Sequence, residues 1–160
     1  MESEIALEPV EVDPQLVAKL TSNYKSGAKW FYWIAGLSIV NSLIILFDGN
    51  VNFVVGLGMT QIVDGVALGM AKAAGGQAAP VIQGVALAIN VGIATMFVLF
   101  GYLSTQRYGW VFVLGMIIYG FDGLIFLIGP SIFSLAFHVF ALFCIFNGYS
   151  ALKKLNAINA

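Results

Sequence analysis

Uncharged apolar stretches long enough to cross a lipid bilayer recur along this chain. Residues 30–47 and residues 81–105 carry no charged side chain. Residues 108–129 are interrupted only by Asp122, and residues 131–152 contain His138 but no Asp, Glu, Lys or Arg. A spanning helix needs about 20 predominantly apolar residues. The pattern therefore predicts four membrane-spanning helices over these ranges.

The segment 53–71 is also apolar, but it contains Gln61, Asp64 and several glycines. If this segment spanned, the protein would have five transmembrane helices, and Arg107 and the C-terminal lysines would lie opposite the N-terminal lysines. With four spans, all of these basic residues lie on one side, as the positive-inside rule favours. The polar residues of the segment share one side of a helical wheel. We therefore predict a re-entrant or amphipathic helix here, with five spans as the alternative.

The remaining segments complete an all-α integral membrane protein. Residues 1–28 are predicted to form an acidic tail and a short juxtamembrane helix, which Asp13 and Pro14 would start as N-cap and first-turn proline. The helical bundle then covers residues 29–152, and residues 153–160 form a C-terminal tail. This topology predicts cytoplasmic termini at both ends, and we expect the bacterial inner membrane as the location.

Composition agrees with a bilayer as the solvent of this protein. The chain is 60% hydrophobic and only 9% charged, whereas soluble proteins contain about 25% charged residues. The mean hydropathy of +0.94 points the same way. The formal net charge is -1 and no basic cluster occurs, so we expect no nucleic-acid partner, because phosphate contacts dominate such binding.

Polar residues within the predicted spans fall at similar depths. Asp122 and His138 lie eight positions before and eight positions after Pro130, so they should face each other across an antiparallel hairpin. Counting at about 1.5 Å per residue, Asn41 and Asn90 reach a similar depth on the other two spans. The four side chains are therefore predicted to form one layer in the outer half of the bundle.

These polar groups have two possible roles. Ionisable side chains within a membrane are costly unless they are paired, and they often mark proton, ion or substrate pathways. Tyr119, one turn before Asp122, could extend such a network, and Gln61 and Asp64 could cap it. The alternative is that the polar residues act only as hydrogen-bonding contacts between helices. For Asp64, the alternative is a solvated polar helix face.

The sequence lacks the motifs of common enzymes and cofactor proteins. It has no glycine-rich phosphate loop, no paired-histidine zinc motif and no Gly-x-Ser-x-Gly. Cys144 and His138 are the single cysteine and the single histidine, which is too few for the usual transition-metal sites. We therefore expect a protein that is not an enzyme and that holds no metal and no cofactor.

Small residues recur every fourth position at Gly84, Ala88 and Gly92, a spacing that lets a neighbouring helix approach closely. We therefore favour an interaction, accessory or assembly subunit that docks another membrane subunit or a second copy of itself. The alternative is a small transporter or proton-coupled membrane component that uses Asp122 and His138. A bundle this short leaves little room for alternating access.

Overall fold

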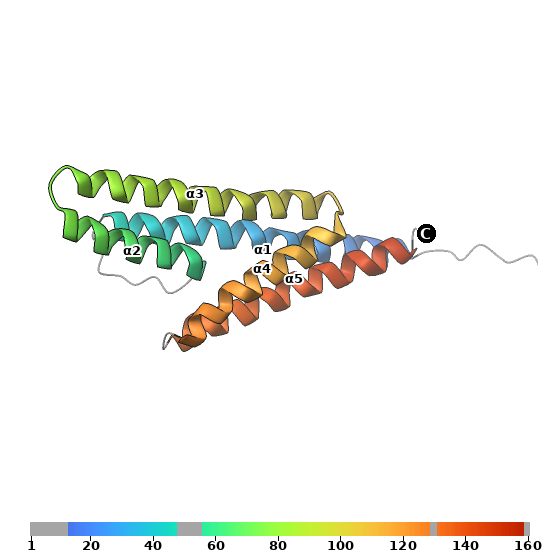
Figure 1. Ribbon diagram of the computed structural model, residues 1–160. Helices are drawn as coiled ribbons and strands as arrows, with labels where there is room; N and C mark the ends of the chain where they lie inside the picture. Colours follow the sequence, from blue (N-terminus) through green and yellow to red (C-terminus); the bar gives the residue numbers. More distant parts are fainter. Residues whose placement is uncertain (1–12, 48–55, 129–130, 159–160) are drawn as a thin grey trace, which may run out of the picture.

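The computed structural model describes residues 13–47, 56–128 and 131–158, and within these ranges the chain forms helices joined by short turns (Figure 1). The helices are α1 (Pro14–Leu46), α2 (Gly58–Ala74), α3 (Ala78–Thr105), α4 (Gly109–Ile128) and α5 (Ile132–Ile158). Helices α1, α3, α4 and α5 are long and apolar enough to cross a membrane. The 17-residue helix α2 is not one of these four.

Several helices extend beyond the predicted boundaries. Asp13 caps α1 by accepting a hydrogen bond from the Gln15 amide at 2.9 Å, and Pro14 begins the helix. The predicted juxtamembrane helix and first span then form one continuous helix of 33 residues. Helix α5 likewise runs through the start of the predicted C-terminal tail to Ile158. Hydropathy reports only the part of a helix that is apolar, so it underestimates helices that project beyond that part.

Helix α1 begins and helix α5 ends at the same end of the molecule (Figure 1). We call this the terminal end, because α1 begins and α5 ends there. The opposite, distal end carries the turn between α2 and α3. Six of the seven basic residues lie near the terminal end and one, Lys72, lies in the last turn of α2. The six are Lys19, Lys25, Lys29, Arg107, Lys153 and Lys154.

Helices α1 and α5 touch through backbone at a pair of glycines. A Cβ atom built on Gly27 would lie 2.5 Å from the Cα of Gly148, and the reverse distance would be 2.6 Å. These distances are far below van der Waals contact, so only glycine fits at either position. The glycine pair therefore sets the closest approach of the first and last helices.

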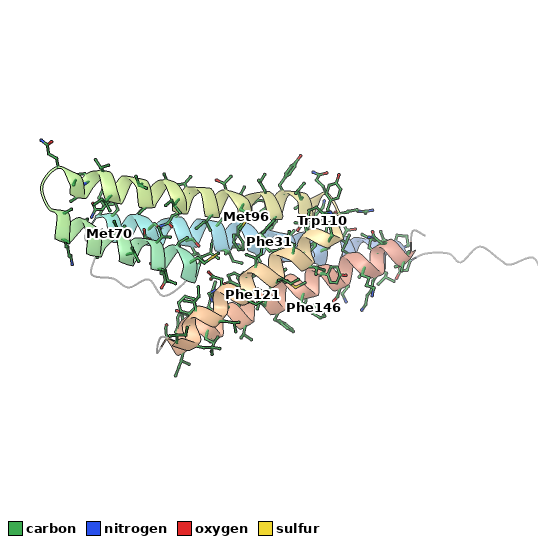
Figure 2. All side chains as sticks on the ribbon, in the orientation of Figure 1. Phe31, Met70, Met96, Trp110, Phe121 and Phe146 are labelled. Atoms are coloured by element: carbon green, nitrogen blue, oxygen red, sulfur yellow. The ribbon has the colours of Figure 1, made fainter. Side chains whose placement is uncertain are left out.

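A column of aromatic rings fills the core between the middle of the bundle and the terminal end. Phe31 of α1 lies at its centre (Figure 2), with ring centroids 6.4 Å from Phe97, 6.0 Å from Phe100 and 6.1 Å from Phe112. Phe97 continues the column to Tyr119 at 6.1 Å. Because Phe31, Phe97 and Phe112 are fully buried, this part of the core is apolar and closed.

Helix α2 begins midway along the bundle and ends at the distal turn (Figure 1). At about 1.5 Å per residue, its 17 residues extend roughly 25 Å. It packs mainly against α3 and also contacts α1 and α4. Gly75 and Gly76 have φ angles of 60° and 50°, a left-handed conformation that glycine adopts at little cost. These two residues reverse the chain into α3.

The polar side of α2 faces the bundle and its apolar side faces outward. Asp64 is only 6% exposed, whereas Ile62, Val66 and Met70 are each at least half exposed. The alternative prediction, that Asp64 lies on a solvated helix face, is therefore wrong. The helix has the amphipathic pattern predicted for the segment 53–71, of which residues 53–55 lie outside the described residues, but its polar residues pack against other helices.

Candidate functional site

Asp122 joins three helices through its carboxylate. Its Oδ2 atom accepts hydrogen bonds from the Gly58 amide at 2.7 Å and from Nε2 of His138 at 2.9 Å. Its Oδ1 atom accepts a bond from the Met59 amide at 2.8 Å. The first amides of a helix have no partner within that helix. Asp122 of α4 thus supplies the N-terminal cap that α2 lacks, and it also pairs with α5.

The hydrogen bonds of His138 define where its protons lie. Its Nδ1 atom is 2.9 Å from the carbonyl oxygen of Ser134, which can only accept, so Nδ1 carries a hydrogen. A second proton must lie between Nε2 and the Asp122 carboxylate, because two lone pairs would repel. The carboxylate form of Asp122 is favoured at the positive end of α2. The pair therefore shares one proton between Nε2 of His138 and Oδ2 of Asp122.

The Asp122–His138 pair is enclosed by rings and by a glycine. The Tyr119 ring stacks on His138 with a centroid distance of 4.3 Å and an interplanar angle of 14°, and the Phe126 ring lies at 5.0 Å. A Cβ atom on Gly123 would lie 3.1 Å from the imidazole, so this glycine makes room for the histidine. The Tyr119 hydroxyl is buried and has no hydrogen-bond partner within the described part of the chain.

A second polar cluster centres on Asp64 of α2. Its Oδ2 atom accepts a hydrogen bond from the Ser42 hydroxyl at 2.7 Å, and its Oδ1 atom accepts one from the side-chain amide of Asn90 at 2.7 Å. The same amide donates to Ser42 at 2.8 Å. Ser42, Asp64 and Asn90 are all buried. This triangle links α1, α2 and α3.

A cavity of about 20 Å³ adjoins this cluster on its distal side. It is lined by Ser42, Asp64 and Gln83 together with apolar side chains of α1, α2 and α3. That volume is enough for one water molecule beside polar groups. Two buried atoms near the clusters, Oδ1 of Asn90 and Nε2 of Gln61, have no hydrogen-bond partner among the described residues. These two atoms in the distal half of the bundle can therefore still form hydrogen bonds.

Helix α1 contributes serines that the sequence analysis did not identify. The Ser38 hydroxyl accepts a hydrogen bond from the Leu57 amide at 3.0 Å and donates to the Ile34 carbonyl at 2.7 Å. Ser42, one turn later, binds Asp64. The available signal was the run of small residues Ala35, Ser38 and Ser42 at helical spacing. Such a run indicates a helix face that another segment can approach.

The predicted single layer is instead two clusters. Asp122 and His138 face each other, as the hairpin geometry indicates, but Asn90 binds Asp64 and Ser42. Asn41 is buried, and no hydrogen bond joins it to either cluster within the described ranges. The reason is that α2 lies beside α1, α3 and α4 in the distal half. The N-terminal amides of α2 bind Asp122, and the Asp64 carboxylate of α2 binds Asn90.

No helix among the described residues packs closely against the predicted small-residue face of α3. Gly84, Ala88 and Gly92 are exposed, and Cβ atoms added to the two glycines would meet nothing within 4 Å. The close contact between helices lies instead at Gly27 and Gly148. Docking of another molecule on the α3 face stays a prediction.

Among residues 13–47, 56–128 and 131–158, no group of three or more His, Cys, Asp or Glu side chains is arranged to hold a metal ion. The structure shows hydrogen bonding at two buried carboxylates, Asp64 and Asp122, and at one imidazole, His138. A comparison with known proteins found no matching protein family, no similar curated protein and no similar solved structure.

Proposed function

We propose that this chain is a small proton-coupled membrane protein. Proton exchange at Asp122 and His138 is linked to the packing of the α2 N-terminus against Asp122. The observation that carries the proposal is that one buried carboxylate holds both the imidazole and the N-terminus of a half-length helix. Ionisable groups at such depth often serve proton pathways.

The protonation state of the pair and the position of α2 depend on each other. When α2 is seated, its amides and its helix dipole stabilise the Asp122 carboxylate, so the shared proton stays on His138. If α2 moves away, this stabilisation is lost and the proton can pass to the carboxylate. Conversely, loss of the shared proton leaves a lone pair facing a carboxylate, which weakens the Asp122–His138 contact. Proton exchange and movement of α2 are therefore coupled.

The distribution of polar and aromatic groups supports access from the distal side. The Asp64 cluster and its cavity lie between the Asp122–His138 pair and the distal end. On the terminal side, the column that includes Phe31, Phe97 and Phe112 closes the core. A proton would reach the pair from the distal side, and its release to the terminal side would require the aromatic column to open.

The membrane placement is part of the proposal. The four long apolar helices and the basic residues of the terminal end support four spans with both termini cytoplasmic in a bacterial inner membrane. With Cys144 replaced by Ala, a cysteine at Gln77 should react with an impermeant reagent from outside the cell. A reporter fused to the C-terminus should be active in the cytoplasm. Labelling at Gln77 only after permeabilisation would contradict this topology.

Proton flux tests the function. Purified protein is reconstituted in vesicles that contain a pH-sensitive dye, and a pH step is applied from either side. We expect faster proton uptake than in protein-free vesicles. Asp122→Asn and His138→Gln should reduce the rate to that of protein-free vesicles, because each variant removes one member of the pair.

Asp13→Asn is the matched control, since it removes a carboxylate at the exposed end of α1 and asparagine caps helices equally well. This variant should keep the wild-type flux. Size-exclusion profiles and unfolding temperatures show whether each variant is folded. If the wild-type rate equals that of protein-free vesicles, or if folded Asp122→Asn and His138→Gln variants keep it, the proposal is wrong.

A second candidate function is supported by the exposed small-residue face of α3. Glycine and alanine at Gly84, Ala88 and Gly92 leave the α3 backbone open to another helix, as expected of an accessory or assembly subunit. The partner that can be tested directly is a second copy of the chain.

Energy transfer between donor-labelled and acceptor-labelled chains in vesicles tests this candidate. A specific dimer should give transfer that persists on dilution with lipid, and Gly84→Leu with Gly92→Leu should abolish it. Leu114→Ala, an exposed change on α4, should leave the transfer unchanged. Transfer that falls with dilution in the same way for all variants would exclude self-association through this face.

A further inference from the structure

A polar groove runs between α1 and α5 near the terminal end, far from the two buried clusters. Its volume is about 420 Å³. Helix α1 lines it from Leu20 to Trp30, and helix α5 lines it from Cys144 to Lys154. Each of these helix segments extends roughly 15 Å at 1.5 Å per residue. The contact between Gly27 and Gly148 holds the two walls together along one side.

The groove changes from polar to apolar along its length. Near the terminal end its walls carry Asn23, Ser150 and Lys154, and Asn147 lies deeper, beside the Gly27–Gly148 contact; all four side chains can donate hydrogen bonds. At the deeper end Trp30 lines it. The Trp30 ring packs edge-on against Phe140 at 5.2 Å, and Phe140 is half exposed. A ligand that fills the groove would thus have a polar head and an apolar tail.

Lys154 is the charged residue among those that line the groove. Within the described part of the chain the one salt bridge joins His138 to Asp122, so Lys154 is not paired there. Lys19 precedes Asn23, Ser26 and Trp30 by four, seven and eleven residues, which places all four on one face of α1. A second cation therefore lies on the helix face that forms this wall.

We propose that this groove binds an anionic phospholipid, with the phosphate of its headgroup at Lys154 and the neighbouring amides and hydroxyl, and an acyl chain along Trp30. Basic pockets between transmembrane helices on the cytoplasmic side suit such headgroups. The phosphate oxygens accept hydrogen bonds from the donors of both walls, and the lipid thereby joins α1 to α5. The proposal rests on the membrane placement, but it does not depend on proton coupling.

Lipid binding to the purified full-length chain tests the proposal. Native mass spectrometry in detergent measures binding of phosphatidylglycerol and of phosphatidylcholine with identical acyl chains. We expect tighter binding of phosphatidylglycerol. Lys154→Gln should weaken that binding about fivefold, the effect of one basic residue at an anionic surface. Ser150→Ala should weaken it as well, because a donor to the phosphate one turn from Lys154 is lost.

Lys153→Gln provides a matched control on the adjacent residue. Lys153 lies on another side of α5, beside Trp110 and Asn156, so this variant loses the same charge without changing the groove. Its affinity for phosphatidylglycerol should equal that of the wild type. Equal losses in Lys153→Gln and Lys154→Gln would show attraction by general surface charge and would overturn the proposal. Equal binding of the two lipids would also overturn it.

Two further measurements identify the ligand. Inorganic phosphate in lipid-free detergent should not raise the unfolding temperature, whereas phosphatidylglycerol should. If phosphate alone reproduces the full increase, the site binds a free anion and the lipid proposal is wrong. In a Trp33→Phe, Trp110→Phe variant, phosphatidylglycerol with brominated acyl chains should quench Trp30 fluorescence. Absence of quenching while the lipid is bound would contradict the placement of the acyl chain.

Discussion

Replacing Asp122 with alanine should destabilise the protein more than any other single truncation of a polar side chain. The Asp122 carboxylate accepts hydrogen bonds from the Gly58 amide, the Met59 amide and His138. Removal of one partner from a buried ion pair costs about 3–5 kcal/mol, because the other partner stays buried without compensation. We expect a loss in this range for Asp122→Ala.

Asp122→Asn should cost less, but it should not be neutral. Its amide NH₂ group would face either the Gly58 amide or the Met59 amide, because each carboxylate oxygen accepts from one of them. One donor is then placed against another donor in either orientation. An unsatisfied buried donor costs about 1–3 kcal/mol, and we expect a loss of this size.

The free energy of unfolding in bicelles, measured by titration with denaturing detergent, checks both values. The double variant Asp122→Ala, His138→Phe should lose less than the sum of its single variants, with a coupling of about 1–3 kcal/mol. Leu124→Ala is the control, since this side chain of α4 is half exposed. A loss below about 1 kcal/mol for Asp122→Ala, or additive effects in the double variant, would refute a stabilising buried contact between Asp122 and His138.

Three further predictions concern packing, the second cluster and the distal turn. Gly148→Ala should lower stability by about 1–3 kcal/mol, because the added methyl group would meet the backbone of α1, while Gly84→Ala should show no loss; thermal unfolding compares the two. Ser42→Ala removes a hydrogen bond to a buried carboxylate, which should cost about 1.5–3 kcal/mol in the detergent titration, and an unchanged midpoint would show that this bond contributes nothing. Gly75→Ala forces a side chain into a left-handed conformation and should cost about 1–2 kcal/mol, measurable as a lower unfolding temperature, whereas an equal or higher temperature would contradict the turn geometry.

Hydropathy predicted the long helices well, because their apolar residues are consecutive in the sequence. It could not give the full length of α1. Lys19, Lys25 and Lys29 interrupt the apolar pattern, yet the helix continues through them since nothing in this stretch breaks it. The N-cap Asp13 and the first-turn Pro14 predicted the start of α1 better than hydropathy did. A capping residue marks where a helix begins through local hydrogen bonds, whereas hydropathy indicates only which part of the helix is apolar.

The pairing of Asp122 with His138 could be predicted because both lie on one hairpin and are equally far from its turn. The partners of Asn90 could not be predicted in this way. They depend on how deeply α2 extends between the other helices, and no spacing in the sequence encodes that depth. The role of Ser38 and Ser42 depends on the same placement, since their partners are Leu57 and Asp64.

The glycine contact between α1 and α5 has a consequence for the order of assembly. Gly27 belongs to α1, and its partner Gly148 in α5 is synthesised more than a hundred residues later. Until α5 is made, Gly27 lacks the close contact that Gly148 provides. The packing of α2 on α3 joins helices that are adjacent in the sequence and can form earlier. Closure of the bundle is therefore the last step, and it awaits the C-terminal helix.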